Sequence, residues 1–171
     1  MSWKLLSSLR IGIVALVMGA GVSLGIVIAQ NDEEPKRTVE GVWRVRIVPR
    51  NCVTGIPIPG AESQALYTFH KDGTMSVWAQ NSMITLTRSP SHGLWQRDQG
   101  WSDYSFKFLH LRYSGSTGAF LGKQEGQGTL VLSESGDEFT TDGSATVFNL
   151  DDVPGTPGCS NSFGTRFKLS L

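Results

Sequence analysis

The chain has 171 residues, carries 15 basic and 15 acidic side chains, and contains 20 glycines but only two cysteines. This length suits one domain with a substantial hydrophobic core. The balance of charge argues against nucleic-acid binding, which needs a basic surface, and two cysteines are too few for a zinc ribbon or a disulfide-dense scaffold.

The first 29 residues have the layout of a secretory signal peptide. Lys4 and Arg10 give a positive start, and residues 11–29 form an apolar run without a charged side chain. A polar linker, residues 30–40, separates this run from the domain that we expect at 41–171. The run is nearly long enough to span a bilayer, so an uncleaved signal-anchor helix is the alternative. Either way we expect the domain outside the cytoplasm. It is secreted or periplasmic if the segment is cleaved, and the segment is its only contact with a membrane if it is not.

The expected export determines the oxidation state that we predict for the two cysteines. In an oxidising compartment an even pair of cysteines usually forms a disulfide. We therefore predict a bond between Cys52 and Cys159, which would join the first predicted strand region to the last. Two unpaired buried thiols are the alternative.

From residue 41 onward the sequence predicts an all-β domain. No window of a dozen residues keeps apolar positions at helical spacing without Gly or Pro, whereas short runs rich in Val, Ile, Thr and aromatic residues recur between turn residues. In chain order the expected strands are 42–48, 65–69, 74–79, 94–97, 104–113, 119–133, 139–150 and 163–169. Residues 83–87 either continue the third strand or form an edge piece, and we expect a turn at 89–93.

About eight consecutive strands joined mostly by short turns favour an antiparallel up-and-down barrel. A sandwich needs longer crossover connections, and only residues 51–61 and 151–158 offer them. A closed barrel of eight strands has an interior that is either filled by side chains or able to hold one small ligand.

Gly41, Val42 and Trp43 open the first predicted strand with a Gly-x-Trp motif, and on this motif the chain resembles lipocalins and their calycin relatives. In that family the Trp plugs one end of the barrel, and a basic residue from near the last strand packs over it. The resemblance implies this role for Trp43 and Gly41, with Arg166 as the basic partner. Together with the export segment, it makes the chain similar to small secreted bacterial β-barrel proteins.

We find no support for catalysis in the sequence. The three histidines, His70, His92 and His110, lack the spacing of metal ligands. No nucleophile elbow and no phosphate-binding loop occurs. We therefore expect a protein that is not an enzyme and has no metal and no cofactor.

Aromatic side chains at strand spacing are the strongest clue to function. The residues that we expect to line the barrel interior are Tyr67, Phe69, Trp78, Trp95, Phe106, Phe108 and His110. They fit a filled core or an apolar pocket. We favour an exported binding module for a small apolar molecule. The alternatives are a filled structural or interaction protein of the cell envelope and, less favoured, a barrel-type isomerase or cyclase with His110 or Glu125 buried inside.

Overall fold

The computed structural model describes residues 37–79 and 86–169. They belong to the second of the chain's two compact units, Pro35–Leu171. The predicted signal peptide or anchor helix and most of the predicted linker lie outside the described residues. Within the described ranges no helix is long and apolar enough to cross a membrane.

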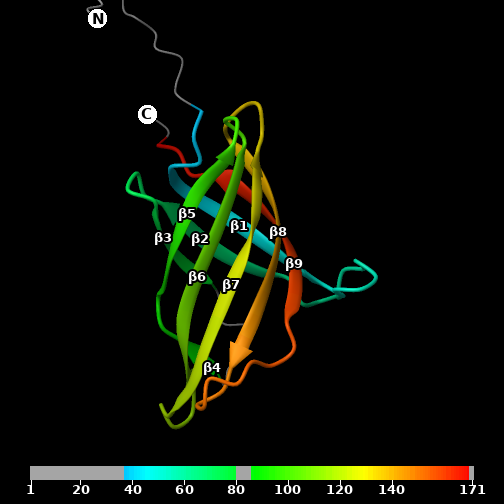
Figure 1. Cartoon of the computed structure of the whole chain (residues 1–171), viewed down its shortest axis with the longest axis vertical. Coiled ribbons are helices and arrows are strands. Elements are labelled where there is room, and N and C mark those ends of the chain that lie inside the picture. Colours follow the sequence, from blue (N-terminus) through cyan, green and yellow to red (C-terminus); the bar gives the residue numbers. More distant parts are fainter. Residues whose placement is uncertain (1–36, 80–85, 170–171) are drawn as a thin grey trace, which may run out of the picture. The chain divides into compact units, whose positions relative to one another are not determined.

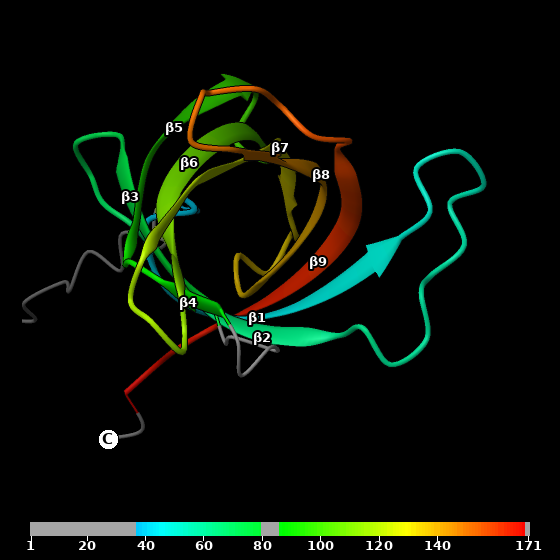
Figure 2. The same cartoon turned by 90° about the horizontal axis from the view of Figure 1, so that it is seen from below.

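The domain is built from nine antiparallel strands. They are β1 Gly41–Arg50, β2 Ser63–Phe69, β3 Thr74–Ala79, β4 Leu86–Arg88, β5 Ser91–Gln99, β6 Asp103–Ser114, β7 Phe120–Leu132, β8 Glu138–Phe148 and β9 Gly158–Arg166. Apart from β4, each strand pairs with the next along the chain, and β9 returns to pair with β1. The ring of eight strands is therefore closed, as Figures 1 and 2 show from the side and from one end. The prediction of an all-β, antiparallel, up-and-down barrel is confirmed.

The short strand β4 lies in line with β5 along the same edge of β6. Arg88 of β4 is paired with Arg112 of β6, and His92 of β5 is paired with Leu109. Between the two strands the N–H of Ser89 donates to the carbonyl of Leu111 at 3.0 Å, and the N–H of Leu111 donates to the Ser89 hydroxyl at 3.0 Å. The predicted turn at 89–93 is therefore wrong in its second half. The Pro that follows Ser89 interrupts the ladder only locally, because only one backbone N–H donor is lost.

The last strand also differs from its predicted range of 163–169. It begins at Gly158 and ends at Arg166. Its first half consists mainly of small polar residues, which have little intrinsic preference for strands. Pairing with β1 on one side and β8 on the other holds it in place, with Asn161 opposite both Val48 and Asp142.

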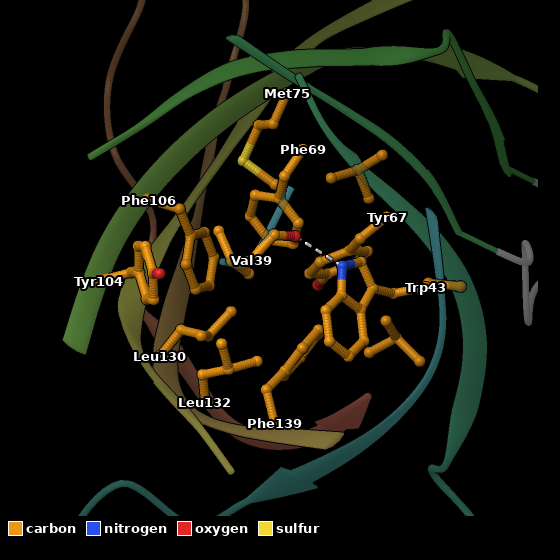
Figure 3. Packing of buried hydrophobic residues seen from close by; sticks show 13 residues of the cluster. Val39, Trp43, Tyr67, Phe69, Met75, Tyr104, Phe106, Leu130, Leu132 and Phe139 are labelled. Carbon is orange, nitrogen blue, oxygen red and sulfur yellow. Dashed lines mark hydrogen bonds between the residues drawn. The ribbon is translucent and has the colours of Figure 1, made fainter. Parts of the chain in front are cut away.

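Apolar side chains fill one end of the barrel. The inward positions of each strand alternate with exposed ones, as in Trp43 and Val45 of β1. Figure 3 shows how rings from β1, β2, β6 and β8 meet there, with Trp43 and Phe139 4.8 Å apart between ring centroids. Gly164 of β9 makes room for this packing, since a Cβ there would lie 2.3 Å from the Phe139 ring.

Arg166 covers this filled end. Its guanidinium lies 4.2 Å from the centroid of the fully buried Trp43 ring. It also donates hydrogen bonds to the carbonyls of Thr38 and Glu40, both at 2.6 Å, and to that of Gly136 at 2.8 Å. These bonds tie the segment before β1 and the turn before β8 to the end of β9. The contact between Trp43 and Arg166 that the resemblance implies is present.

Gly41 stands where the segment before β1 turns into the strand. Its φ of +125° is unfavourable for any residue with a side chain. An added Cβ would also approach the guanidinium of Arg166 to 3.0 Å. The glycine of the Gly-x-Trp motif is therefore required by the backbone turn and by the arginine that packs against it.

Cys52 and Cys159 form the predicted disulfide, with their Cα atoms 5.2 Å apart. The bond joins the loop after β1 to the first residues of β9. In the β1–β9 ladder Arg50 is the partner of Cys159. The disulfide thus fastens the ladder at the end opposite to Arg166.

Loss of this bond should destabilise the domain. Its two cysteines are 107 residues apart, and closing so long a loop restricts the unfolded chain enough to contribute about 4 kcal/mol. We expect Cys52→Ser combined with Cys159→Ser to lower the free energy of unfolding by about this amount in urea denaturation. An unchanged midpoint, or two thiols that alkylate without reductant, would contradict the assignment.

Loss of Arg166 should also be costly. The Arg166→Met variant gives up three hydrogen bonds to backbone carbonyls, and we expect a loss of about 3 kcal/mol in the same assay. Arg166→Lys should recover only part of it, because an ammonium cannot form the same fork. Arg44→Met is the matched control, because Arg44 points outward from β1 and is exposed. Equal midpoints for Arg166→Met and the control would refute the role of Arg166.

Candidate binding cavity

The interior is not filled along its whole length. A cavity of about 440 Å³ lies toward the end opposite to Trp43 and Arg166. Its wall is formed by the later residues of β1, such as Ile47 and Pro49, and by the first residues of β9. This is the end of the barrel at which β4 is labelled in Figure 1.

The deeper wall of the cavity is aromatic and aliphatic. Tyr67, Phe106 and Phe108 line it together with Val77. The rings of Phe106 and Phe108 are stacked, with an interplanar angle of 5° and centroids 6.2 Å apart. Tyr67 lies 6.3 Å from each of them in an edge-on orientation. These rings form a rigid apolar surface to which the body of a ligand can bind.

Hydroxyl groups occupy the side of the cavity formed by β8 and β9. Thr141, Ser160 and Ser162 line it there. Burial raises the pKa of Tyr67 to about 12, although its contact with the Ser162 hydroxyl acts in the opposite direction. Tyr67 therefore keeps its proton at neutral pH and can donate a hydrogen bond.

The outer part of the cavity carries positive charge. Arg88 and His110 line it, and Arg112 lies directly across the β4–β6 ladder from Arg88. The Nε atoms of both arginines and Nε2 of His110 are buried and have no hydrogen-bond partner among the described residues. The other ring nitrogen of His110 lies 3.4 Å from the hydroxyl oxygen of Ser91. Within the described part of the chain, no carboxylate lines this cavity.

His110 is held neutral by these surroundings. Burial is the largest cause that lowers its pKa to about 4, and the charges of Arg88 and Arg112 act in the same direction. A contact with Gln124 opposes them without offsetting them. Burial and the neighbouring charge of Arg112 also lower the pKa of Arg88. Arg88 and Arg112 are therefore two adjacent cations without a counter-ion among the described residues, next to a neutral imidazole.

Four of the seven residues predicted to line the interior do meet at the cavity: Tyr67, Phe106, Phe108 and His110. Phe69 is buried in the packed cluster instead. Trp95 packs between Phe69 and Tyr104, with centroids 6.0 and 5.7 Å away. The rings of Phe69 and Trp95 therefore do not line the cavity.

Trp78 is placed on the outside of the barrel and is 61% exposed. The prediction grouped it with the other aromatic residues. In β3, however, the buried positions are Met75 and Val77, and strand alternation turns the next side chain outward. Trp78 stands opposite Leu66, which is also exposed.

Arg88 and Arg112 were not among the residues predicted to form the site. Arg112 could have been found, because it continues the period-two series of Tyr104, Phe106, Phe108 and His110 on one face of β6. Arg88 could not, because the Ser-Pro interruption that follows it conceals the register of β4 with β6. Its position became evident only from the pairing with Arg112.

Glu125, the carboxylate considered for an isomerase or cyclase, lies outside the barrel. It forms an ion pair with Lys107 at 2.8 Å. His70 and His92 are exposed and do not line the cavity. In the described ranges no cluster of three or more His, Cys, Asp or Glu side chains could hold a metal ion.

A shallower hollow of about 690 Å³ lies on the outer face of the strands from β5 to β8. Its wall includes exposed, outward-facing side chains such as Leu94, Lys107 and Asp142. It is a depression in a curved sheet rather than an enclosed site. In the interior cavity polar groups converge, and the pKa values of Tyr67, Arg88 and His110 are shifted. Both features are typical of a binding site.

Comparison with protein-family models and with curated proteins gives no match. The function must therefore be argued from the site itself.

The buried His110 should make the domain less stable in mild acid. Its pKa is about 4 in the folded state and about 6.5 in an unfolded chain. Between these values the unfolded state binds a proton that the folded state does not, so the free energy of unfolding falls as the pH is lowered, by up to about 3 kcal/mol.

The measurement is urea denaturation at a series of pH values from 7 down to about 4. His110→Asn should remove most of this part of the pH dependence. His92→Asn, at an exposed position of β5, should retain it. Identical pH profiles for wild type and His110→Asn would show that His110 is not the group responsible.

Proposed function

We propose that the protein is a binding module that holds a small molecule with an apolar body inside one end of the barrel. The observation that carries this proposal is the cavity of about 440 Å³. Its volume lies in the range of small-molecule sites, about 300–1,000 Å³, and such sites combine apolar walls with a few polar groups. The stacked Phe106 and Phe108 and the hydroxyl of Tyr67 supply both kinds of surface.

A filled structural barrel fits this interior less well. The tightly packed rings gather at the end at Trp43, whereas several inward positions toward the other end are small or polar, such as Ala145 and Ser160. A barrel selected only for stability would gain from larger apolar side chains at these positions.

The same proposal places the domain outside the cytoplasm and assigns it binding rather than catalysis. The disulfide between Cys52 and Cys159 supports an oxidising compartment. The charge pattern of the first 29 residues supports export.

Filling the cavity should abolish binding of an apolar probe. Ala145 of β8 lines the cavity, whereas its neighbour Thr146 is paired with Glu125 on the outer face. We expect Ala145→Phe to weaken binding of the neutral fluorescent probe N-phenyl-1-naphthylamine by about tenfold or more, and Thr146→Phe to change it by less than about twofold.

Circular dichroism should show that both variants keep the strand content of wild type. Equal affinities for the probe in wild type and Ala145→Phe would contradict the proposal. Failure of the probe to bind wild type would also contradict it.

A further inference from the structure

We infer that the ligand of this cavity is an amphipathic anion, whose negatively charged headgroup is bound by Arg88, Arg112 and His110 and whose apolar body lies against Phe106 and Phe108. This inference rests on the proposed function and specifies the class of ligand. The headgroup is a carboxylate or a phosphate monoester, because both present oxygen acceptors to forked guanidinium donors.

The first observation is the pairing of two like charges. Arg88 and Arg112 are directly opposite each other in the β4–β6 ladder, an arrangement that destabilises a sheet when nothing neutralises it. Burial adds to this cost, because a charge removed from water needs a partner. Two adjacent arginines at the end of a cavity are therefore suited to a bound anion.

The second observation is unmet hydrogen-bonding capacity. The Nε atoms of Arg88 and Arg112 and Nε2 of His110 are buried without a partner among the described residues. The one other such atom among the described residues is Nε of Arg50, whose guanidinium is ion-paired with Asp142. Buried polar atoms in folded proteins nearly always have partners, so three unpartnered nitrogens in one cluster need an explanation. A headgroup oxygen at this place would accept hydrogen bonds from them, since neutral His110 can carry its proton on Nε2 while Nδ1 faces Ser91.

The third observation is that neither arginine has an acidic partner among the described residues. Several outward-facing cations are paired with acids, such as Lys107 with Glu125 at 2.8 Å and Arg50 with Asp142 at 2.6 Å. None of the ion pairs formed by the described residues includes Arg88 or Arg112. The sequence between β3 and β4, residues 80–85, also contains no acidic residue. The described residues therefore supply no acidic counter-charge to Arg88 or Arg112 at the end of the cavity.

The inner face of β6 orders the two parts of the site along one line. Phe106, Phe108, His110 and Arg112 follow each other at alternate positions, so each step advances about 7 Å. The series passes from apolar rings through a neutral imidazole to a fixed positive charge. A ligand bound along this strand would place its apolar part at the rings and its anion at the arginines.

The test compares ligands that share a chain and differ in the headgroup. Displacement of N-phenyl-1-naphthylamine by decanoate, decyl phosphate and decan-1-ol is measured for wild type, Arg88→Met, Arg112→Met and the exposed control Arg44→Met. We expect wild type and the control to bind at least one of the two anions about tenfold more tightly than the alcohol. Each inner variant should lose most of this preference and keep its affinity for decan-1-ol. The stronger of the two anions identifies the headgroup.

Thermal unfolding of the ligand-free variants separates binding from a structural role. Because each inner substitution removes one of two opposed, unpaired cations, we expect the midpoint of Arg88→Met and Arg112→Met to be equal to that of wild type or higher. A lower midpoint in both would mean that the arginines support the fold, and would overturn the inference.

The binding assay distinguishes the two proposals. Equal affinity of wild type for the alcohol and both anions overturns the anionic headgroup and leaves the apolar binding function standing. Failure of N-phenyl-1-naphthylamine to bind wild type overturns the binding function itself and the headgroup with it.

Discussion

The seam between β1 and β9 is the contact on which the barrel depends. All other neighbouring strands of the ring follow each other in the chain, so this pairing alone joins its two sequence ends and removes the exposed edges. The seam is fastened at both ends by different chemistry. At one end Arg166 covers Trp43 and binds three backbone carbonyls, and at the other the disulfide between Cys52 and Cys159 closes the ladder covalently.

Because the seam is held at both ends, side chains need not fill the two ends of the interior equally. Large rings fill the end at Trp43 and supply most of the hydrophobic stabilisation. The other end needs no such filling, because the disulfide holds it together. Small and polar inward side chains can then leave a cavity there, and two arginines can be kept without carboxylates at a cost in stability. A site that is less stable when empty is a common compromise between stability and function.

The sequence predicted the fold well because strand alternation and turn residues are local signals. These signals predicted the all-β class and the up-and-down order. The disulfide was inferred from the expected export and the pair of cysteines, and the contact between Trp43 and Arg166 was implied only by the resemblance to lipocalins. The prediction from sequence failed where pairing partners override local preference, as in the polar first half of β9 and the start of β5 at Ser91, inside the expected turn. It also failed for Trp78, because residue type was given more weight than the alternation that turns this side chain outward.

The candidate site was predictable only in part, for a related reason. Its aromatic wall follows from alternation within β2 and within β6, but the cationic cluster requires two strands to be set in register across an interruption. Arg88 and Arg112 are 24 positions apart in the sequence and become neighbours only through the β4–β6 ladder. Neither the missing counter-charge nor the orphaned nitrogens can be seen until that ladder is known.

The central claim is that one end of a closed barrel holds a small anionic molecule with an apolar body. Native mass spectrometry of the protein purified from its own host tests it most directly. We expect a species heavier than the disulfide-bonded chain by one small molecule, which on release is an acid with an apolar body. A chain that carries no molecule, or one that retains a neutral compound, would contradict it.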